Sequence, residues 1–178
     1  MTALPTPDIR SLKYTLLKDR SVALKDFECG ESTADRNIDK CCEWQSMHRA
    51  RVFCAHMDGI EQAYGFYCLG ILAQDPGGMD ADIVRAGEGR KFVPFIYVHY
   101  IGVRREFQNQ NIGTMLLGNL LERCGMVVRN VGVFGVALNA LTPEVAKLYH
   151  KYGFRQRDER KYPLMILPSQ SLIELTGG

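Results

Sequence analysis

The chain has 178 residues, of which 46% are hydrophobic and 24% are charged, and its formal net charge is +2 at pH 7. These values are typical of a globular protein, they exclude a disordered chain, and they suit a single domain over residues 1–178. No apolar run is long enough to span a bilayer, and residues 1–7 lack the pattern of a targeting signal, so we expect a cytoplasmic protein without a membrane partner.

Short apolar runs predict strands, and apolar residues at helical spacing predict helices. In chain order, the expected strands are 14–17, 51–57, 62–72, 92–103, 131–138, 154–156 and 162–167. Helices are expected at 32–48, capped by Ser32 or Thr33, at 112–124, and at 143–152, capped by Thr142. Asp58-Gly59 indicates a hairpin turn, and residues 74–91 a long loop. This order predicts an α/β fold, with a mixed sheet and helices on its faces.

Six cysteines and four histidines show no spacing typical of a metal site, because no Cys-x-x-Cys pair occurs. Cys54 and Cys68 lie in apolar runs, where a thiol packs as a small hydrophobic group. We therefore expect reduced, structural cysteines and no metal.

The most informative segment joins the longest predicted strand to the helix that begins near Ile112. A helix N-terminus offers unpaired backbone N–H groups and the positive end of its dipole, which suits a pyrophosphate. Further along, Leu148-Tyr149-His150-Lys151-Tyr152-Gly153-Phe154 places tyrosines near a helix end, where Gly153 is expected to adopt a left-handed conformation. The two segments together suggest an enzyme that uses an acyl-coenzyme A.

Over most of its length the sequence resembles the Gcn5-related N-acetyltransferase (GNAT) family, whose coenzyme A (CoA) signature is Gln/Arg-x-x-Gly-x-Gly/Ala. Gln108 and Gly113 match this signature, Asn111 replaces its first glycine, and Asn109 stands where many members carry glycine. Because asparagine tolerates left-handed backbone, we expect the loop to keep its shape. The resemblance implies a mixed, mostly antiparallel sheet of about seven strands, helices on both faces and a splayed CoA-binding cleft.

A narrower resemblance links the chain to the acetyltransferase toxins of bacterial toxin–antitoxin systems. Phe27-Glu28-Cys29-Gly30-Glu31 is similar to their Phe-x-Cys-Gly entry, and Ile101-Gly102-Val103 to the approach to their CoA loop. Those enzymes acetylate the α-amine of an aminoacyl-tRNA and stop translation. The resemblance implies acetyl-CoA as cofactor, an aminoacyl-tRNA as acceptor, an antitoxin protein as partner, and a homodimer.

The resemblance also implies which residues bind acetyl-CoA. The main chains of Ile101 and Val103 would face the pantetheine and the thioester. The pyrophosphate would lie against Gln108, Asn109, Gln110, Asn111, Ile112, Gly113 and Thr114. Arg104 and Arg105 would add positive charge near the 3′-phosphate or the adenine.

Amide formation from a thioester needs a neutral amine, a polarised carbonyl and a proton for the leaving thiolate. Tyr149 matches the general acid of the family, and a phenol with a pKa of about 10 suits that task. The alternative is that Tyr149 only packs against its neighbours. His99 could act as a base through water, or could be an ordinary strand residue.

Positive charge gathers in the last third of the chain, where residues 147–161 hold six basic and two acidic side chains. Such a patch favours an anionic ligand or substrate, and CoA alone would suffice. Candidate phosphate contacts for an RNA acceptor are Arg49, Arg51, Arg85, Arg90, Lys91, Lys147, Lys151, Arg155 and Arg157. Acetylation of a small amine or a protein amine, and a non-catalytic CoA-binding interaction module, are the alternatives.

Overall fold

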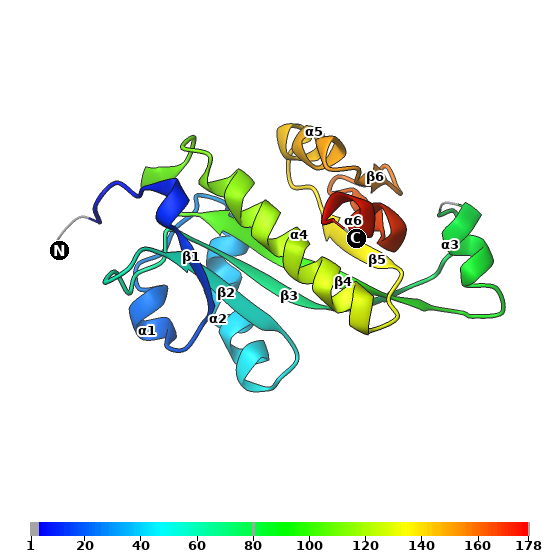
Figure 1. The fold of residues 1–178 in the computed structure, drawn as a ribbon, viewed down its shortest axis with the longest axis horizontal. Coiled ribbons are helices and arrows are strands. Elements are labelled where there is room, and N and C mark those ends of the chain that lie inside the picture. Colours follow the sequence, from blue (N-terminus) through cyan, green and yellow to red (C-terminus); the bar gives the residue numbers. More distant parts are fainter. Residues whose placement is uncertain (1–3, 80, 178) are drawn as a thin grey trace. The chain divides into compact units, whose positions relative to one another are not determined.

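The computed structural model describes residues 4–79 and 81–177. Its seven strands form a sheet in the hydrogen-bonded order β1-β2-β3-β4-β5-β7-β6 (Figure 1). The strands are β1 (Lys13–Leu16), β2 (Arg51–His56), β3 (Gly65–Gln74), β4 (Val93–Val103), β5 (Gly135–Asn139), β6 (Arg155–Gln156) and β7 (Leu164–Pro168). The helices are α1 (Arg20–Ala23), α2 (Ser32–Ser46), α3 (Ala81–Ala86), α4 (Ile112–Asn130), α5 (Pro143–Lys151) and α6 (Ser169–Leu175), with short 3-10 helices η1 (Ile9–Ser11) and η2 (Arg105–Phe107).

The sheet is mixed and mostly antiparallel. β1 pairs with β2, β2 with β3, β5 with β7 and β6 with β7, all antiparallel, whereas β4 and β5 run parallel. The predicted hairpin of β2 and β3 is present, and Gly59 in its turn has a left-handed φ of 74°. The structure thus confirms the α/β fold class expected from the sequence.

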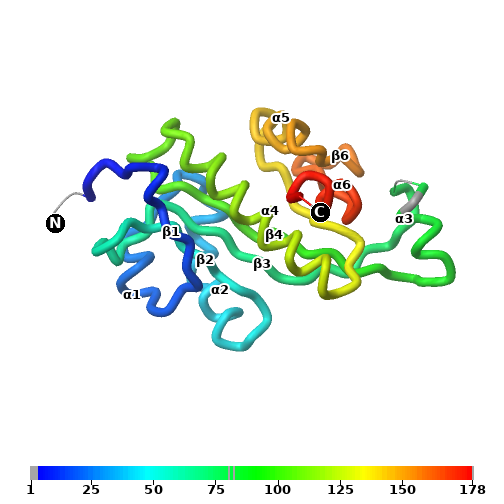
Figure 2. Tube along the Cα trace, viewed as in Figure 1, coloured from blue at the N-terminus to red at the C-terminus, as the bar shows by residue number. Residues whose placement is uncertain are grey.

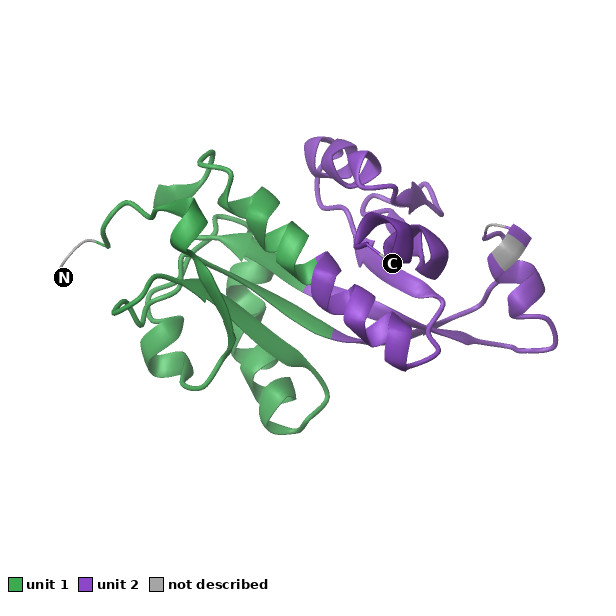
Figure 3. Ribbon diagram, in the orientation of Figure 1, with its two compact units in different colours: residues 1–69, 100–120 green, residues 70–99, 121–178 purple. Residues whose placement is uncertain are grey.

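The contacts between Cα atoms divide the chain into two compact units, which are coloured separately in Figure 3. Unit 1 comprises residues 1–69 and 100–120, and unit 2 comprises residues 70–99 and 121–178. β3, β4 and α4 contribute residues to both units. The organisation of residues 1–178 as a single domain stays a prediction.

In unit 1, successive side chains of β3 point to opposite faces of the sheet, as a strand requires. On one face, the hydroxyl of Tyr67 donates to Asn119 Oδ1 of α4 at 2.7 Å, and a Cβ at Gly65 would lie 2.5 Å from Leu116 Cδ1. The other face contributes to a buried cluster with α2, which includes Ile38, Cys41, Phe66 and Cys68. Helices α2 and α4 therefore cover opposite faces of this part of the sheet.

In unit 2, the chain runs out along β3, passes through α3 and returns along β4 (Figure 2). Its core joins these segments to β5 and β7 through Ile83, Val93, Phe95, Ala137, Leu164 and Ile166. Helix α5 begins as predicted, because Thr142 Oγ1 accepts from the N–H of Val145 at 3.3 Å and Pro143 occupies the first turn. Gly153 beyond its end has the expected left-handed φ of 86°.

Several element boundaries differ from the predictions. The loop expected at 74–91 contains α3, and the predicted helix 112–124 continues to Asn130. The cap of α2 is Glu31, whose carboxylate accepts from the N–H of Thr33 at 3.1 Å, so the prediction of Ser32 or Thr33 was wrong by one or two positions. The short helices α1 and α6 were not predicted, because they contain too few apolar residues to show helical spacing.

All six cysteines are free thiols. Within the described residues, no helix is both long and apolar enough to cross a membrane.

The start of β5 depends on a glycine. Gly135 has a φ of +149°, and a Cβ there would lie 2.2 Å from the carbonyl oxygen of Leu167. We expect Gly135→Ala to lower the free energy of unfolding by about 2 kcal/mol or more, measured by urea denaturation. Gly132→Ala is the control, because no described atom lies within 4 Å of its Cβ position. Equal stability of the two variants would contradict this explanation.

Candidate active site

The connection between β4 and α4 lies entirely in unit 1. After Val103, η2 forms one turn that is closed by a hydrogen bond from Phe107 N to Arg104 O at 2.9 Å. In the loop that follows, Asn109 and Asn111 both have a left-handed φ of 61°. Left-handed backbone is the conformation that glycine adopts most readily and asparagine tolerates. The structure therefore confirms that the loop accommodates asparagine at both positions by left-handed backbone.

The first turn of α4 offers the donors that a pyrophosphate needs. The hydrogen bond from Met115 N to Asn111 O, at 3.1 Å, is the first of the helical type. The backbone N–H groups of Ile112, Gly113 and Thr114 precede it and have no acceptor within the helix. They point along the helix axis with the positive end of the dipole. This donor set fits the pyrophosphate of acetyl-CoA.

The side chains near this loop are less available than the sequence suggested. Gln108 Nε2 donates to Cys29 O at 2.6 Å and to Val103 O at 3.0 Å, so its main chain is the part left for a cofactor. Arg104 is only 5% exposed. The expectation that Arg104 would add charge near the 3′-phosphate was therefore wrong, because its guanidinium lies inside the protein.

The strand that leads to the loop extends beyond the residues that pair with β5. β4 pairs with β5 from Ile96 to Val98, and then continues to Val103. Ile101 and Val103 are half-buried, whereas Gly102 between them is buried. A Cβ at Gly102 would lie 3.2 Å from Cys29 Cβ, so that side of the strand is closely packed. This end of β4 can present its main chain to a ligand without exposing its side chains.

Tyr149 belongs to unit 2 and lies in the last turns of α5. Its side chain is 4% exposed, and its ring packs against Phe154 with 5.6 Å between the ring centroids. Burial raises the pKa of Tyr149 to about 12. The phenol therefore holds its proton throughout the physiological range, as a general acid must. The same burial suits a packing role, so the catalytic role is a proposal.

His99 is half-buried and lies in the part of β4 that belongs to unit 2. Its ring meets Tyr97 edge to face, with centroids 4.9 Å apart. Tyr97 Oη donates to Asn139 Oδ1 at 2.5 Å, and Asn139 Nδ2 donates to Tyr162 O at 2.9 Å. Burial also raises the pKa of Tyr97.

Tyr97, Asn139 and Tyr162 form a polar network that the sequence reasoning did not predict. The one available signal was Asn139, a polar residue that directly follows the apolar run of β5.

Two of the predicted phosphate contacts, Arg49 and Arg51, are exposed residues of unit 1. Six others are exposed residues of unit 2: Arg85 in α3, Arg90 and Lys91 in the loop before β4, Lys147 and Lys151 in α5, and Arg155 in β6. Exposure leaves these side chains able to meet phosphates.

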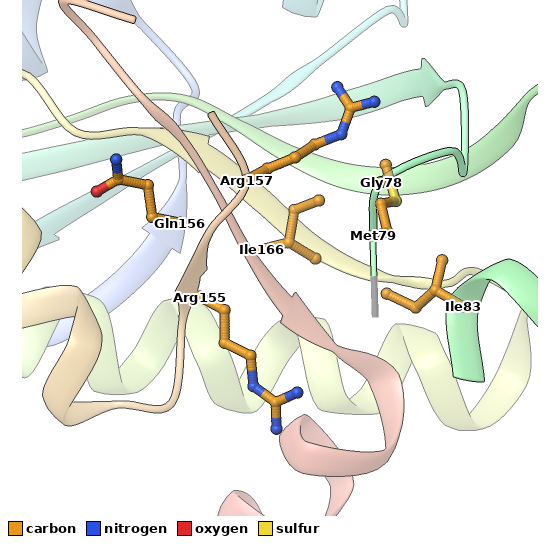
Figure 4. A pocket seen from close by; sticks show the side chains of 7 residues that line it. All are labelled: Gly78, Met79, Ile83, Arg155, Gln156, Arg157 and Ile166. Atoms are coloured by element: carbon orange, nitrogen blue, oxygen red, sulfur yellow. The ribbon is translucent and has the colours of Figure 1, made fainter. Parts of the chain in front are cut away.

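The guanidinium of Arg157 is held by hydrogen bonds within unit 2. Its Nη2 donates to Asp75 O at 3.2 Å and to Gly77 O at 3.0 Å. It borders a cavity of about 120 Å3, in which Arg155 and Arg157 point away from each other on either side of Ile166 (Figure 4). Arg157 therefore ties β6 to the segment after β3, and its side chain is not free for a substrate phosphate.

Among the described residues, no group of three or more His, Cys, Asp or Glu side chains could hold a metal ion.

The left-handed loop yields a stability prediction. We expect Asn111→Val to lower the free energy of unfolding by about 1–2 kcal/mol, because a β-branched residue resists left-handed backbone. Asn111→Gly should stay within about 0.5 kcal/mol of wild type, because glycine adopts that conformation freely. Thermal unfolding measures both, and Gln110→Val, at a neighbour outside the left-handed pair, is the control. A similar loss in the valine variants at 110 and 111 would exclude the backbone as the cause.

Comparison with known proteins gives two kinds of match. The model of the acetyltransferase (GNAT) domain matches residues 48–156, which is more than half of the chain. Among solved structures, a mutant of KacT superposes with a TM-score of 0.80 at 18% identity, covering 93% of this chain and 99% of that one.

Two structures of AtaT are similarly related. The AtaTR complex bound with acetyl-CoA has a TM-score of 0.79 at 19% identity and covers 94% of this chain and 99% of that one. AtaT complexed with acetyl-methionyl-tRNAfMet has a TM-score of 0.80 at 18% identity, with 93% and 99% covered. At this identity the likeness shows the fold, whereas the domain match shows the family. The chain belongs to the acetyltransferase (GNAT) domain family, whose cosubstrate is acetyl-CoA.

Proposed function

We propose that the protein transfers the acetyl group of acetyl-CoA to the α-amino group of an aminoacyl-tRNA and so inhibits translation. The use of acetyl-CoA is supported by the loop before α4, where two asparagines with left-handed backbone precede the helix N-terminus. The acceptor is inferred from the shared fold with AtaT, which is known in complex with acetyl-methionyl-tRNAfMet. The basic side chains of unit 2 are compatible with an acceptor that carries phosphates.

Transfer needs one new bond and one broken bond. The neutral amine attacks the acetyl carbonyl carbon, and the carbon–sulfur bond breaks. The amine nitrogen loses one proton to solvent, and the sulfur takes up a proton. We assign that proton to Tyr149 Oη, because Tyr149 matches the general acid of the family and its raised pKa keeps the phenol protonated over the pH range of the reaction. The backbone N–H groups of the splayed end of β4, at Ile101 and Val103, would hold the acetyl donor in place. A strong base is not needed, because the amine of an aminoacyl ester is already partly neutral at pH 7.

We also propose the setting of the reaction. The structures that share the fold include complexes of AtaT with the antitoxin AtaR, which supports an antitoxin partner for this chain. A homodimer and a cytoplasmic location are part of the same proposal. Sedimentation of the purified protein and cell fractionation would test them.

Tyr149→Phe should lower kcat by about a hundredfold or more, because general-acid catalysis typically contributes that much. Acetyl-CoA affinity should change little, because the hydroxyl acts on the transition state. Tyr152→Phe, three positions away on the chain, is the matched control and should keep most activity. A Tyr149→Phe enzyme with wild-type kcat would remove the tyrosine from the mechanism.

The pKa of Tyr149 also predicts a pH profile. An acid with a pKa of about 12 is still protonated at pH 10, so kcat should rise with amine deprotonation and then stay level up to pH 10. A fall in kcat centred between pH 8 and 9 would contradict a general acid with a pKa of about 12, provided that circular dichroism shows the enzyme folded there.

The acceptor is tested with labelled acetyl-CoA and two pools: total charged tRNA, and a mixture of polyamines and peptides. We expect label in the tRNA pool, and none with Tyr149→Phe. Label only in the second pool would keep the enzyme class but replace the acceptor. Label in neither pool, with CoA bound, would favour a binding module.

A further inference from the structure

Arg104 is the one charged side chain in the buried core of the described residues. A buried guanidinium is unfavourable unless its donors find acceptors. Its three nitrogens donate to backbone carbonyls, Nε to Ala63 at 3.1 Å, Nη1 to Asp26 at 2.8 Å and Nη2 to Lys25 at 3.1 Å. The guanidinium carbon also lies 5.1 Å from the ring centroid of Phe27. Arg104 is thus bound by neutral groups that belong to other segments.

The segment that contains Lys25 and Asp26 also accepts hydrogen bonds from Arg105 and Gln108, the residues that lead into the loop. Arg105 N donates to Glu28 O at 2.8 Å, and Gln108 Nε2 donates to Cys29 O at 2.6 Å. In all, four carbonyls of residues 25–29 accept hydrogen bonds from residues 104, 105 and 108: those of Lys25, Asp26, Glu28 and Cys29. We call residues 25–30 the entry segment.

The entry segment is itself fixed to the start of α2. Asp35 accepts from Cys29 N at 2.8 Å, from Gly30 N at 3.0 Å and from the Cys29 thiol at 3.1 Å. Gly30 has a left-handed φ of 80°, and a Cβ there would lie 3.0 Å from the guanidinium of Arg105. The Phe-x-Cys-Gly motif thus has a physical explanation: each of its named residues shapes a surface against which residues 102–108 lie.

We propose that Arg104 is a positioning residue for acetyl-CoA, acting through the entry segment on the loop at residues 108–111. The inference rests on the assignment of that loop to the pyrophosphate. The loop is held at one end by the side chain of Gln108 and at the other by Ile112, which is 1% exposed. Without Arg104, the entry segment loses two of its four ties, and Gln108 loses a fixed acceptor. The loop is then no longer fixed in a position that leaves the N–H groups at the start of α4 accessible to acetyl-CoA.

The test is the affinity for CoA itself, measured by titration calorimetry on folded protein, because it needs no acceptor. We expect Arg104→Met to raise the dissociation constant at least tenfold. Arg104→Lys, which keeps the charge and part of the hydrogen bonding, should raise it less. Arg104→Lys therefore serves as a second variant if the Arg104→Met protein fails to fold. With saturating acetyl-CoA, kcat should stay within threefold of wild type, since the loss is one of binding.

Two further variants separate the possible explanations. Val52→Ala weakens the same core in unit 1 away from the loop, and its CoA affinity should stay within twofold of wild type. Gly113→Asp places a negative charge at the N–H groups and should abolish binding. Wild-type affinity in the Arg104 variants, with binding lost in Gly113→Asp, would overturn the positioning role alone. Wild-type affinity in Gly113→Asp would overturn the loop assignment on which it rests.

Discussion

The loop that we assign to acetyl-CoA, at residues 108–111, depends on the hydrogen bonds of the buried Arg104 guanidinium. A helix N-terminus binds an anion only while the preceding chain stays in place and leaves its N–H groups accessible. That chain contains one 3-10 turn, η2, and then an irregular loop, so regular hydrogen bonding holds only part of it. Arg104 replaces such bonding with three hydrogen bonds to carbonyls of two other segments. Hydrogen bonds from a charged donor are among the stronger ones available to a protein.

The second constraint is the left-handed backbone of the loop. The family signature meets it with glycine, whereas this chain uses Asn109 and Asn111 at a φ of 61°. The exchange adds two side-chain amides next to the helix start, and both asparagines adopt the left-handed backbone that glycine would provide. Asparagine brings less conformational entropy to the unfolded chain than glycine, which favours the folded loop. The departure from the signature is therefore compatible with acetyl-CoA binding.

How far the sequence predicts the structure depends on the range of the interactions involved. Helix α5 was predicted with its cap and its final glycine, because these signals lie within one helix length of each other. The left-handed asparagines were expected because they stand where members of the family carry glycine. From the sequence alone, in contrast, Arg104 would be interpreted as a solvated arginine, because its acceptors lie 41, 78 and 79 positions earlier in the chain. Only the folded chain shows that this arginine is internal.

A crystal structure of the protein with bound acetyl-CoA is the most direct test of the cofactor site. We expect the pyrophosphate oxygens to accept hydrogen bonds from the backbone N–H groups of Gly113 and Thr114. Asn109 and Asn111 should keep their left-handed conformation, and Arg104 should keep its three carbonyl partners. A pyrophosphate bound elsewhere, with the start of α4 left in contact with solvent, would contradict the account.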